Sequence, residues 1–398
     1  MEVLFVSYKY PPSIGGMQKQ SYELISGFEA QGGMHKLVHN YQGYVFIFFL
    51  SLFFRIPYML IKHPGIDVIH FNDGVCGLCC IWVRLITRRK LSVTYHGLDL
   101  VFPNRLYQFL IRKWMIHFDV LIAVSEYTKS LCVEKGFDKS KVFTVLNGVS
   151  TNDLCQPELV SQKYKTIIHR ARQSGKSIIT AIGRPVSRKG FVWFVKEVLP
   201  KLNSHIFILI GPYPKYGKFL QALLKILPSS LSNQVVMGWG LSTEHNDLVQ
   251  LEENNMTSFR WLKDVDNNTK NYLLKNSDLL VMPNVKISGD MEGFGLVALE
   301  ANSCGVPVVA SRIEGITSAV TEGINGLLLS DENNLEWIEK LNSLSFSNYN
   351  ETYTKKALRE FVANHYSWHK MVSRYRAIFE YSINNQLVVN PLINHSIK

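Results

Sequence analysis

Two acidic residues eight positions apart, Glu292 and Glu300, lie in the segment EGFGLVALE. The segment stands between two apolar runs, at 278–284 and 306–312. Such runs are typical of buried parallel strands, which predicts a crossover helix between them. A carboxylate without a partner is costly to bury. We therefore expect Glu300 to accept hydrogen bonds from a ribose diol and Glu292 to accept them from sugar hydroxyls. The spacing alone arises by chance in many chains, and its place between two strands carries the prediction.

The predicted helix begins near Phe294 or Gly295. A helix start presents N–H groups that have no partner within the helix, together with the positive end of the dipole. Gly293 and Gly295 have no side chain, so a ligand can approach this backbone closely. The stretch from Gly293 to Leu296 therefore predicts a site for a phosphate or a diphosphate.

Two cations, Arg184 and Lys189, follow the apolar run 177–183 in the segment IGRPVSRKG. Cations and helix N–H groups can stabilise the charge that develops on a diphosphate leaving group. This pair therefore predicts a phosphate clamp that needs neither a metal ion nor a cofactor. A solvated basic turn is the alternative interpretation.

The first half of the chain offers weaker candidates. Gly15 and Gly16 follow the first apolar run and would let the backbone approach the donor phosphates or the acceptor, although a simple turn also explains them. The loop lacks GxGxxG, which argues against a dinucleotide dehydrogenase. Asp73 ends another run, where it could orient or deprotonate an acceptor or only cap the next helix. His96 also lies at a strand end, where a structural role is common.

Apolar runs alternate with helix-like segments along the whole chain. Strands are predicted at 2–8, 36–39, 67–71, 90–96, 120–125, 141–146, 177–183, 205–211, 234–237, 259–262, 278–283, 306–310 and 326–329. Repeated strand–helix–strand units indicate parallel sheets with helices on both faces. We predict an α/β protein with two facing, doubly wound, Rossmann-like domains and a ligand cleft between them. The predicted parts are a first domain at 1–165, a second domain at 166–365, a helix at 366–383 and a tail at 384–398.

Six segments in this order resemble those of the retaining glycosyltransferases of family 4, which have the GT-B fold. They are SYKYPPSIGGMQ (7–18), TYHGLDL (94–100), VSEYTK with VLNGVS (145–150), IGRPVSRKG (182–190), the paired-glutamate segment, and YSWHKMVSRYRAIFEYS (366–382). The resemblance implies transfer from a nucleotide diphosphate sugar with retained anomeric configuration. It also implies that His96 contacts the donor sugar in the transition state. For Arg184, Lys189, Glu292 and Glu300 it implies the same roles as those given above. The resemblance further implies that the first domain binds the acceptor, that the second binds the nucleotide sugar, and that the helix at 366–383 returns to the first domain.

This sequence departs from the family pattern at two positions where a glycine is usual. Lys263 stands after the run 259–262, in a neighbourhood that helps to hold the nucleotide base in the family. Glu314 stands near the expected donor site. The base, the sugar and the acceptor are therefore not predicted by the resemblance.

Charge and hydropathy indicate the partners. Lysine and arginine exceed aspartate and glutamate by 11, which favours an anionic substrate or membrane surface, and no nucleic-acid recognition motif is evident. Scattered cysteines and no signal peptide ahead of the first strand predict the cytoplasm. The apolar stretch within 45–61 predicts either a buried helix or a helix lying at the membrane interface, with Arg55 and Lys62 near lipid phosphates. The second case would place the protein peripherally on the inner face of the membrane.

The function predicted from these features is sugar transfer to a lipid-linked oligosaccharide or another precursor of a surface polysaccharide, such as capsule or lipopolysaccharide. A phosphorylase or a nucleotide-sugar epimerase of the same fold is an alternative. A non-catalytic protein that binds sugar nucleotides is a third, and four retained polar site residues argue against it.

Overall fold

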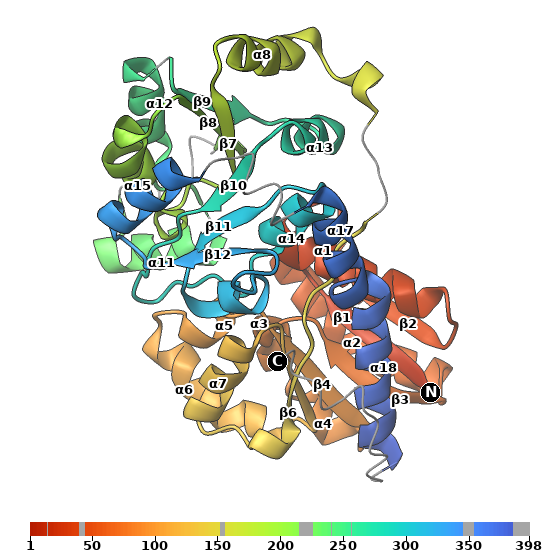
Figure 1. Ribbon diagram of the computed structural model, residues 1–398. Helices are drawn as coiled ribbons and strands as arrows, with labels where there is room; N and C mark the ends of the chain where they lie inside the picture. Colours follow the sequence, from red (N-terminus) through yellow and green to blue (C-terminus); the bar gives the residue numbers. More distant parts are fainter. Residues whose placement is uncertain are drawn as a thin grey trace. The chain divides into compact units, whose positions relative to one another are not determined.

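The computed structural model describes residues 1–13, 15–39, 44–151, 156–214, 226–239, 241–255, 257–344 and 354–384. The chain forms two compact units, one made of Met1–Gly148 with the chain from Tyr366 onward, and the other of Val149–His365 (Figure 1). The boundary lies at 148/149 and not after residue 165 as predicted. The reason is helix α8 (Gln162–Gln173), which buries Ile168 and Ala171 in the core of the second unit. The predicted tail lies outside the described residues after Asn384.

The first unit is a parallel sheet of six strands in the order β2-β1-β3-β4-β5-β6. The strands are β1 (Glu2–Ser7), β2 (Met34–Val38), β3 (Ile66–Phe71), β4 (Lys90–Tyr95), β5 (Val120–Ala123) and β6 (Val142–Thr144). Its helices are α1 (Gly16–Glu29), α2 (Val45–Lys62), α3 (Gly74–Cys79), α4 (Val83–Ile86), α5 (Leu98–Val101), α6 (Arg105–Trp114), α7 (Glu126–Glu134) and α18 (Trp368–Asn384).

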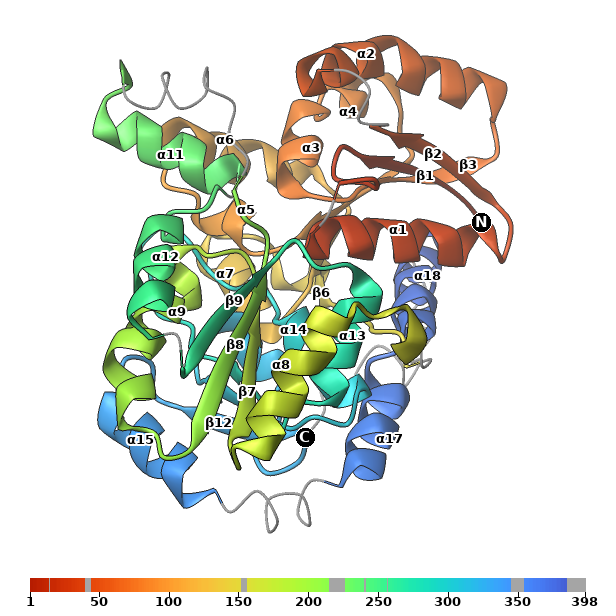
Figure 2. The same ribbon diagram turned by 90° about the horizontal axis from the view of Figure 1, so that it is seen from above.

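Helices cover both faces of this sheet, so the side chains that alternate along its strands are buried on both sides. Leu4 and Val6 point into a core that also holds residues of α2, α4 and α6. Phe5 points the other way and packs edge-on against Phe28 of α1. Figure 2 shows α2, α3 and α4 on one side of strands β1 to β3 and α1 on the other.

Helix α18 belongs to the first unit although the second unit precedes it in the chain. Its Tyr375 hydroxyl lies 2.8 Å from the Thr94 hydroxyl of β4 and accepts a hydrogen bond of 3.1 Å from the Gln20 amide of α1. Phe379 packs against Phe28. These contacts are fully buried, so α18 completes the core on its side of the sheet.

Helix α2 has one buried and one exposed apolar face. Phe48, Leu52 and Ile56 are buried against the sheet, whereas Phe46 and Phe54 are 70% and 80% exposed. Among the described residues, α2 is the one helix whose length and composition would allow it to cross a membrane, a test that core helices also pass. The buried-helix prediction therefore accounts for only one side of this helix.

The second unit has a parallel sheet in the order β12-β11-β10-β7-β8-β9. The strands are β7 (Ser177–Ile182), β8 (His205–Gly211), β9 (Phe259–Lys263), β10 (Leu279–Met282), β11 (Val308–Ser311) and β12 (Gly326–Leu329). The helices are α8, α9 (Phe191–Trp193), α11 (Ser229–Trp239), α12 (His245–Asn254), α13 (Asn267–Lys275), α14 (Leu296–Ser303), α15 (Asn334–Ser343) and α17 (Lys355–His365). The predicted strand 234–237 is wrong, because these residues lie in α11.

This sheet is also buried on both faces. Ile179 and Phe207 share one core with Trp337 of α15, and Ile178 and Ile208 share another with residues of α8 and α13. The predicted pair of doubly wound parallel sheets is therefore confirmed.

Candidate active site

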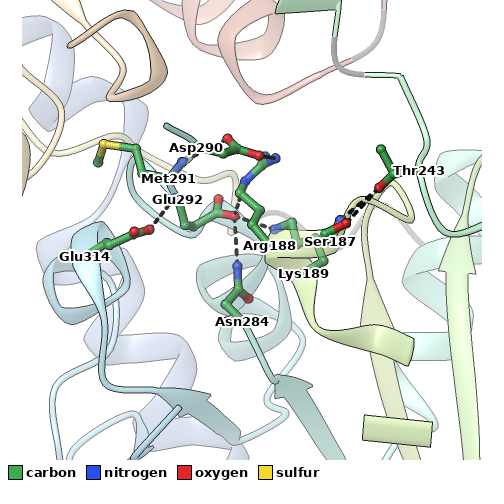
Figure 3. Close-up of polar contacts among 9 residues, drawn as sticks. All are labelled: Ser187, Arg188, Lys189, Thr243, Asn284, Asp290, Met291, Glu292 and Glu314. Atoms are coloured by element: carbon green, nitrogen blue, oxygen red, sulfur yellow. Dashed lines mark hydrogen bonds and ion pairs between the residues drawn. The ribbon is translucent and has the colours of Figure 1, made fainter. Parts of the chain in front are cut away.

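Three loops of the second unit meet at the carboxyl ends of neighbouring strands (Figure 3). The turn 187–189 follows β7, residues 283–295 connect β10 to α14, and the turn 314–318 follows β11. Because β11, β10 and β7 are adjacent in the sheet, the parallel topology brings these loops together. Ligands of such sheets collect at this edge.

Lys189 and Glu292 form the centre of the site. The Lys189 Nζ lies 2.7 Å from Glu292 Oε2, and the two side chains are only 10% and 14% exposed. The Asn284 amide donates a hydrogen bond of 3.2 Å to the same oxygen. Burial alone would raise the pKa of Glu292, but Lys189 and Arg188 overcome that effect and lower the pKa to about 2. Glu292 is therefore ionised at neutral pH.

Arg188 connects two acids of the β10 loop. Its NH1 lies 3.1 Å from Asp290 Oδ2, and its Nε lies 3.7 Å from Glu292 Oε2. Figure 3 shows the guanidinium between these carboxylates, with Lys189 beside it. Arg188 was not predicted, because a basic turn gives no sign of which of its side chains points inward.

A close approach of two backbones sets the position of this basic turn. Gly190 follows Lys189 with a left-handed φ of 64°, and a Cβ there would stand 1.8 Å from the carbonyl oxygen of Pro283. The amide of Val285 also donates to the Arg188 carbonyl at 3.0 Å. Only glycine allows the turn after β7 to press against the end of β10 in this way.

Glu314 and Gly315 hold the backbone of Glu292. The Glu292 amide donates to Glu314 Oε2 at 2.6 Å, and the Gly315 amide donates to the Glu292 carbonyl at 3.1 Å. Burial, and then repulsion by Glu292 and Asp290, raise the pKa of Glu314 to about 7, against the effect of its hydrogen bond from the Glu292 amide. The sequence indicated that Glu314 replaces a usual glycine near the donor site, but not that it contacts Glu292.

The predicted helix after this loop is α14, which begins at Leu296 with Gly295 as its N-cap. Phe294 is buried. Glu300 is not a bare buried carboxylate, because the Nζ of Lys270 lies 2.9 Å from its Oε2. The argument that Glu300 needs a ribose diol as its partner is therefore corrected: Lys270 of α13, which the sequence did not single out, already partners it.

Arg184 lies in the loop that follows β7, and its charge contributes to lowering the pKa of Lys189, although burial is the larger cause. The structure thus brings Arg184, Lys189 and Glu292 into one region. Helix α14 starts at the end of the β10 loop that holds Glu292. Within the described residues, no cluster of three or more His, Cys, Asp or Glu side chains could hold a metal ion.

The remaining candidates lie in the first unit, also where strands end. Asp73 caps α3 by accepting a hydrogen bond of 2.8 Å from the Cys76 amide, and its second oxygen is buried without a hydrogen-bond partner among the described residues. Burial is the main cause that raises the pKa of Asp73 to about 7. The His96 Nε2 lies 2.8 Å from the Asn72 carbonyl and donates to it. Burial lowers the pKa of His96 and so favours the neutral ring, in which Nδ1 is an acceptor.

Gly15 and Gly16 stand where the first β-strand leads into α1. Gly15 is the N-cap and Gly16 the first residue of the helix. The role of both glycines in binding the donor phosphates or the acceptor stays a prediction.

Family models identify the chain. The model described as "Glycosyl transferases group 1" matches residues 170–361, and the model described as "Glycosyltransferase Family 4" matches residues 35–153. The chain is a family 4 glycosyltransferase. The loops that hold Arg184, Lys189, Glu292 and Glu300 all fall within the first of these matches.

Relatives of this glycosyltransferase include an "uncharacterized 41.2 kDa protein in cps region" of Klebsiella pneumoniae, 25% identical over 342 residues that cover 83% of each chain. A glycosyltransferase of Rickettsia africae has a similar structure, with a TM-score of 0.71 at 17% identity over 97% of this chain and 99% of the other. The Anabaena protein Alr3699/HepE, solved with UDP, has a TM-score of 0.67 at 16% identity over 96% and 100%. At these identities the two structures show the fold, GT-B with two Rossmann-like domains.

Proposed function

We propose that this glycosyltransferase moves a sugar from a nucleotide diphosphate sugar to a lipid-linked oligosaccharide or another surface-polysaccharide precursor, with retained anomeric configuration and without a metal ion. The observation that carries the proposal is the buried group in which Lys189 and Asn284 both contact Glu292 in the loop that leads into α14. This group offers both charge for a phosphate and hydrogen-bond acceptors for a sugar.

Support for the donor comes from an unsatisfied acceptor. Asn284 is 1% exposed, and its Oδ1 has no hydrogen-bond partner among the described residues. A buried carbonyl oxygen in this state favours a ligand that brings hydroxyl groups. The Anabaena protein, which shares the fold, was solved with UDP and with UDP-glucose. We therefore propose a UDP-sugar as the first donor to test.

The proposed chemistry uses position and charge and needs no protein nucleophile. Arg184, Lys189 and the first N–H groups of α14 would stabilise the departing diphosphate. The acceptor hydroxyl would attack the face that the diphosphate leaves, and a departing phosphate oxygen would accept its proton. His96 would contact the donor sugar through its unprotonated Nδ1, and Glu300 would accept from the ribose while keeping its ion pair with Lys270.

A panel of sugar nucleotides tests the donor. A ligand that binds only the native state raises the melting temperature with its occupancy. The wild type should be stabilised by one UDP-sugar more than by the others, and Lys189→Ala should lose that shift. Lys196→Ala is the matched control, because Lys196 is an exposed cation of the same unit outside the site. No shift with any sugar nucleotide, or an undiminished shift in Lys189→Ala, would contradict the proposal.

Product analysis tests the reaction. Retained anomeric configuration in a product formed on a lipid-linked acceptor, with EDTA present, is the expected result. Release of an epimerised sugar nucleotide without any acceptor would favour the epimerase alternative, and dependence on inorganic phosphate as co-substrate would favour the phosphorylase.

Support for a lipid-linked acceptor and a peripheral membrane location comes from the outer surface of the first unit. Helix α2 exposes Phe46, Phe54 and Ile61, and the end of α4 exposes Leu85. Helix α6 adds Phe109, whose ring lies under the Lys113 ammonium. Because α2, α4 and α6 pack against the same core, their exposed residues share one outer layer. Aromatic and basic side chains on such a layer suit a membrane interface.

Charge favours an anionic membrane. Residues 44–119 contain nine Lys or Arg and four Asp; Asp73 and Asp99 are buried, and Asp119 forms an ion pair with Arg84. The nine cations are Arg55, Lys62, Arg84, Arg88, Arg89, Lys90, Arg105, Arg112 and Lys113. Each basic residue near an anionic bilayer contributes about 1 kcal/mol of attraction. The relative from the Klebsiella cps region is consistent with a substrate for capsule synthesis.

Vesicle flotation tests the membrane part separately from catalysis. Wild-type protein should float with phosphatidylglycerol vesicles and less with phosphatidylcholine vesicles, and the triple change Phe46→Ser, Phe54→Ser and Ile61→Ser should reduce flotation. Tyr22→Ser is the matched control, because Tyr22 is a 46% exposed aromatic residue of α1, on the opposite face of the sheet. Equal flotation of the triple variant and the wild type would remove this support for a lipid-linked acceptor.

A further inference from the structure

We propose that Glu314 is a positioning residue that fixes Glu292 for contact with the donor sugar. The inference rests on the proposed function, in which Glu292 accepts hydrogen bonds from sugar hydroxyls. Glu314 approaches Glu292 from the side opposite to Lys189 (Figure 3). Lys189 holds the carboxylate of Glu292, whereas Glu314 holds its backbone amide at 2.6 Å.

The backbone of Glu314 indicates that its side chain is there for a reason. Its φ of 48° lies in the left-handed region, which glycine adopts readily and a residue with a Cβ does not. A strained residue persists when the surrounding structure demands it. The backbone conformation at position 314 therefore favours glycine, so the glutamate side chain must offset this strain with an interaction that glycine cannot make. The hydrogen bond to the Glu292 amide is that contribution.

Gly315 hydrogen-bonds the carbonyl of Glu292, as Glu314 does its amide, so both backbone polar groups of Glu292 are bonded by residues 314 and 315. The Gly315 amide donates to the Glu292 carbonyl at 3.1 Å, and a Cβ on Gly315 would stand 2.0 Å from the Gly293 carbonyl oxygen. The 314–315 backbone therefore lies directly against the 292–293 backbone. Glu292 is held by its amide and its carbonyl from one side, and by its carboxylate from the other.

The charges that face Glu314 come from two elements. Asp290 and Glu292 of the β10 loop repel its ionised form, and Arg188 of the turn after β7 attracts it. Burial, and after it the repulsion by these acids, raises the pKa of Glu314 to about 7. An ionised carboxylate accepts a stronger hydrogen bond than a neutral one. The hydrogen bond from the Glu292 amide to Glu314 therefore weakens as the pH falls through about 7. The affinity for the donor sugar should fall over the same pH range.

Three substitutions separate positioning from stability. Glu314→Ala and Glu314→Gly both remove the hydrogen bond, but only glycine relieves the left-handed strain, so Glu314→Gly should melt at a higher temperature than Glu314→Ala. Glu314→Gln keeps an amide oxygen that can accept from Glu292 but removes the charge. Each variant is measured for binding of UDP and of the UDP-sugar that stabilises the wild type most, between pH 6 and pH 8.

If Glu314 positions Glu292, the Glu314→Ala and Glu314→Gly variants should bind the UDP-sugar equally weakly, by about 10-fold or more below the wild type. Both variants should bind UDP as the wild type does. Gln should recover part of the affinity and lose the pH dependence. Binding that follows melting temperature, with Gly better than Ala, would show a structural role and overturn the inference, as would equal affinity of all variants for the UDP-sugar. A wild type that binds UDP-sugars no more tightly than UDP would refute the proposed sugar contact itself.

Discussion

Replacing Lys189 by methionine tests the centre of the site, because it keeps most of the side-chain stem and removes the charge. Glu292 would remain buried with Arg188 Nε at 3.7 Å and the Asn284 amide at 3.2 Å. Removing one partner of a buried ion pair usually costs about 3–5 kcal/mol. The fall of the Glu292 pKa from 4.5 to about 2 corresponds to about 3 kcal/mol of net stabilisation, which remains after the opposing effect of burial and comes from Lys189, Arg188 and the Asn284 hydrogen bond. We therefore expect Lys189→Met to lower the free energy of unfolding by about 2 kcal/mol at pH 7.

The loss should depend on pH in a stated direction. Glu292 has a pKa below its ordinary value in the folded state, so its ionised form stabilises the fold above about pH 4.5, and this stabilisation is lost as the pH falls toward 2. The difference between wild type and Lys189→Met should therefore be full at pH 6 to 7 and shrink in acid. Urea denaturation at several pH values measures it, with Lys196→Met as the control. The double variant Lys189→Met, Glu292→Gln should recover part of the stability.

Two results would refute this reasoning. A stability loss at pH 7 below about 0.5 kcal/mol, the range of ordinary surface changes, would show that the pair does not hold the loop. Normal turnover by folded Lys189→Met protein would show that Lys189 does not stabilise the leaving group. Lys189→Arg separates charge from fit: it should keep most of the stability, but lose activity where a compact ammonium is needed.

Asp73→Asn keeps the cap on α3 and removes a buried acid whose pKa is raised to about 7, so it should raise the free energy of unfolding by about 1–2 kcal/mol at pH 8 and have little effect at pH 4, as measured by urea denaturation. Lost turnover in this stabler variant would favour a role with the acceptor, and unchanged turnover the capping role alone. Gly190→Ala should destabilise by about 2 kcal/mol or more and weaken donor binding, because its Cβ would overlap the Pro283 carbonyl; a neutral effect in thermal unfolding would contradict that contact. Tyr375→Phe should destabilise by about 1–3 kcal/mol, since it leaves the buried Gln20 amide without this acceptor, and unchanged unfolding in guanidinium would argue against the assigned bond.

The architecture was readable from the sequence because parallel strands that are buried on both faces form continuous apolar runs. The run at 205–211 is an example, in which all seven residues of β8 are buried. The predicted strand at 234–237 failed because two adjacent valines are too short a signal. Leu231, Val235 and Trp239 repeat at four-residue spacing, which favours the observed helix α11.

The candidate site was predictable only where a residue type has a chemical meaning in its own segment. Lys189 and Glu292 could be named in this way, but their ion pair joins loops that are 103 positions apart in the chain. Arg188 and Asn284 carry no local signal, because their roles come from the adjacency of β7 and β10. Lys270 shows the same limit: the sequence indicated that Glu300 needed a partner, and only the fold brings Lys270 of α13 within 2.9 Å of it.

The return of α18 to the first unit has a consequence for biosynthesis. A ribosome releases all of Val149–His365 before it releases Tyr375 and Phe379. Until then, Phe28 and the Gln20 amide lack the residues that cover them in the finished protein. The nascent amino-terminal sheet therefore has α1 but not α18 on this side until the last helix is translated, and during that interval the apolar residues that α18 will cover are exposed to non-native contacts.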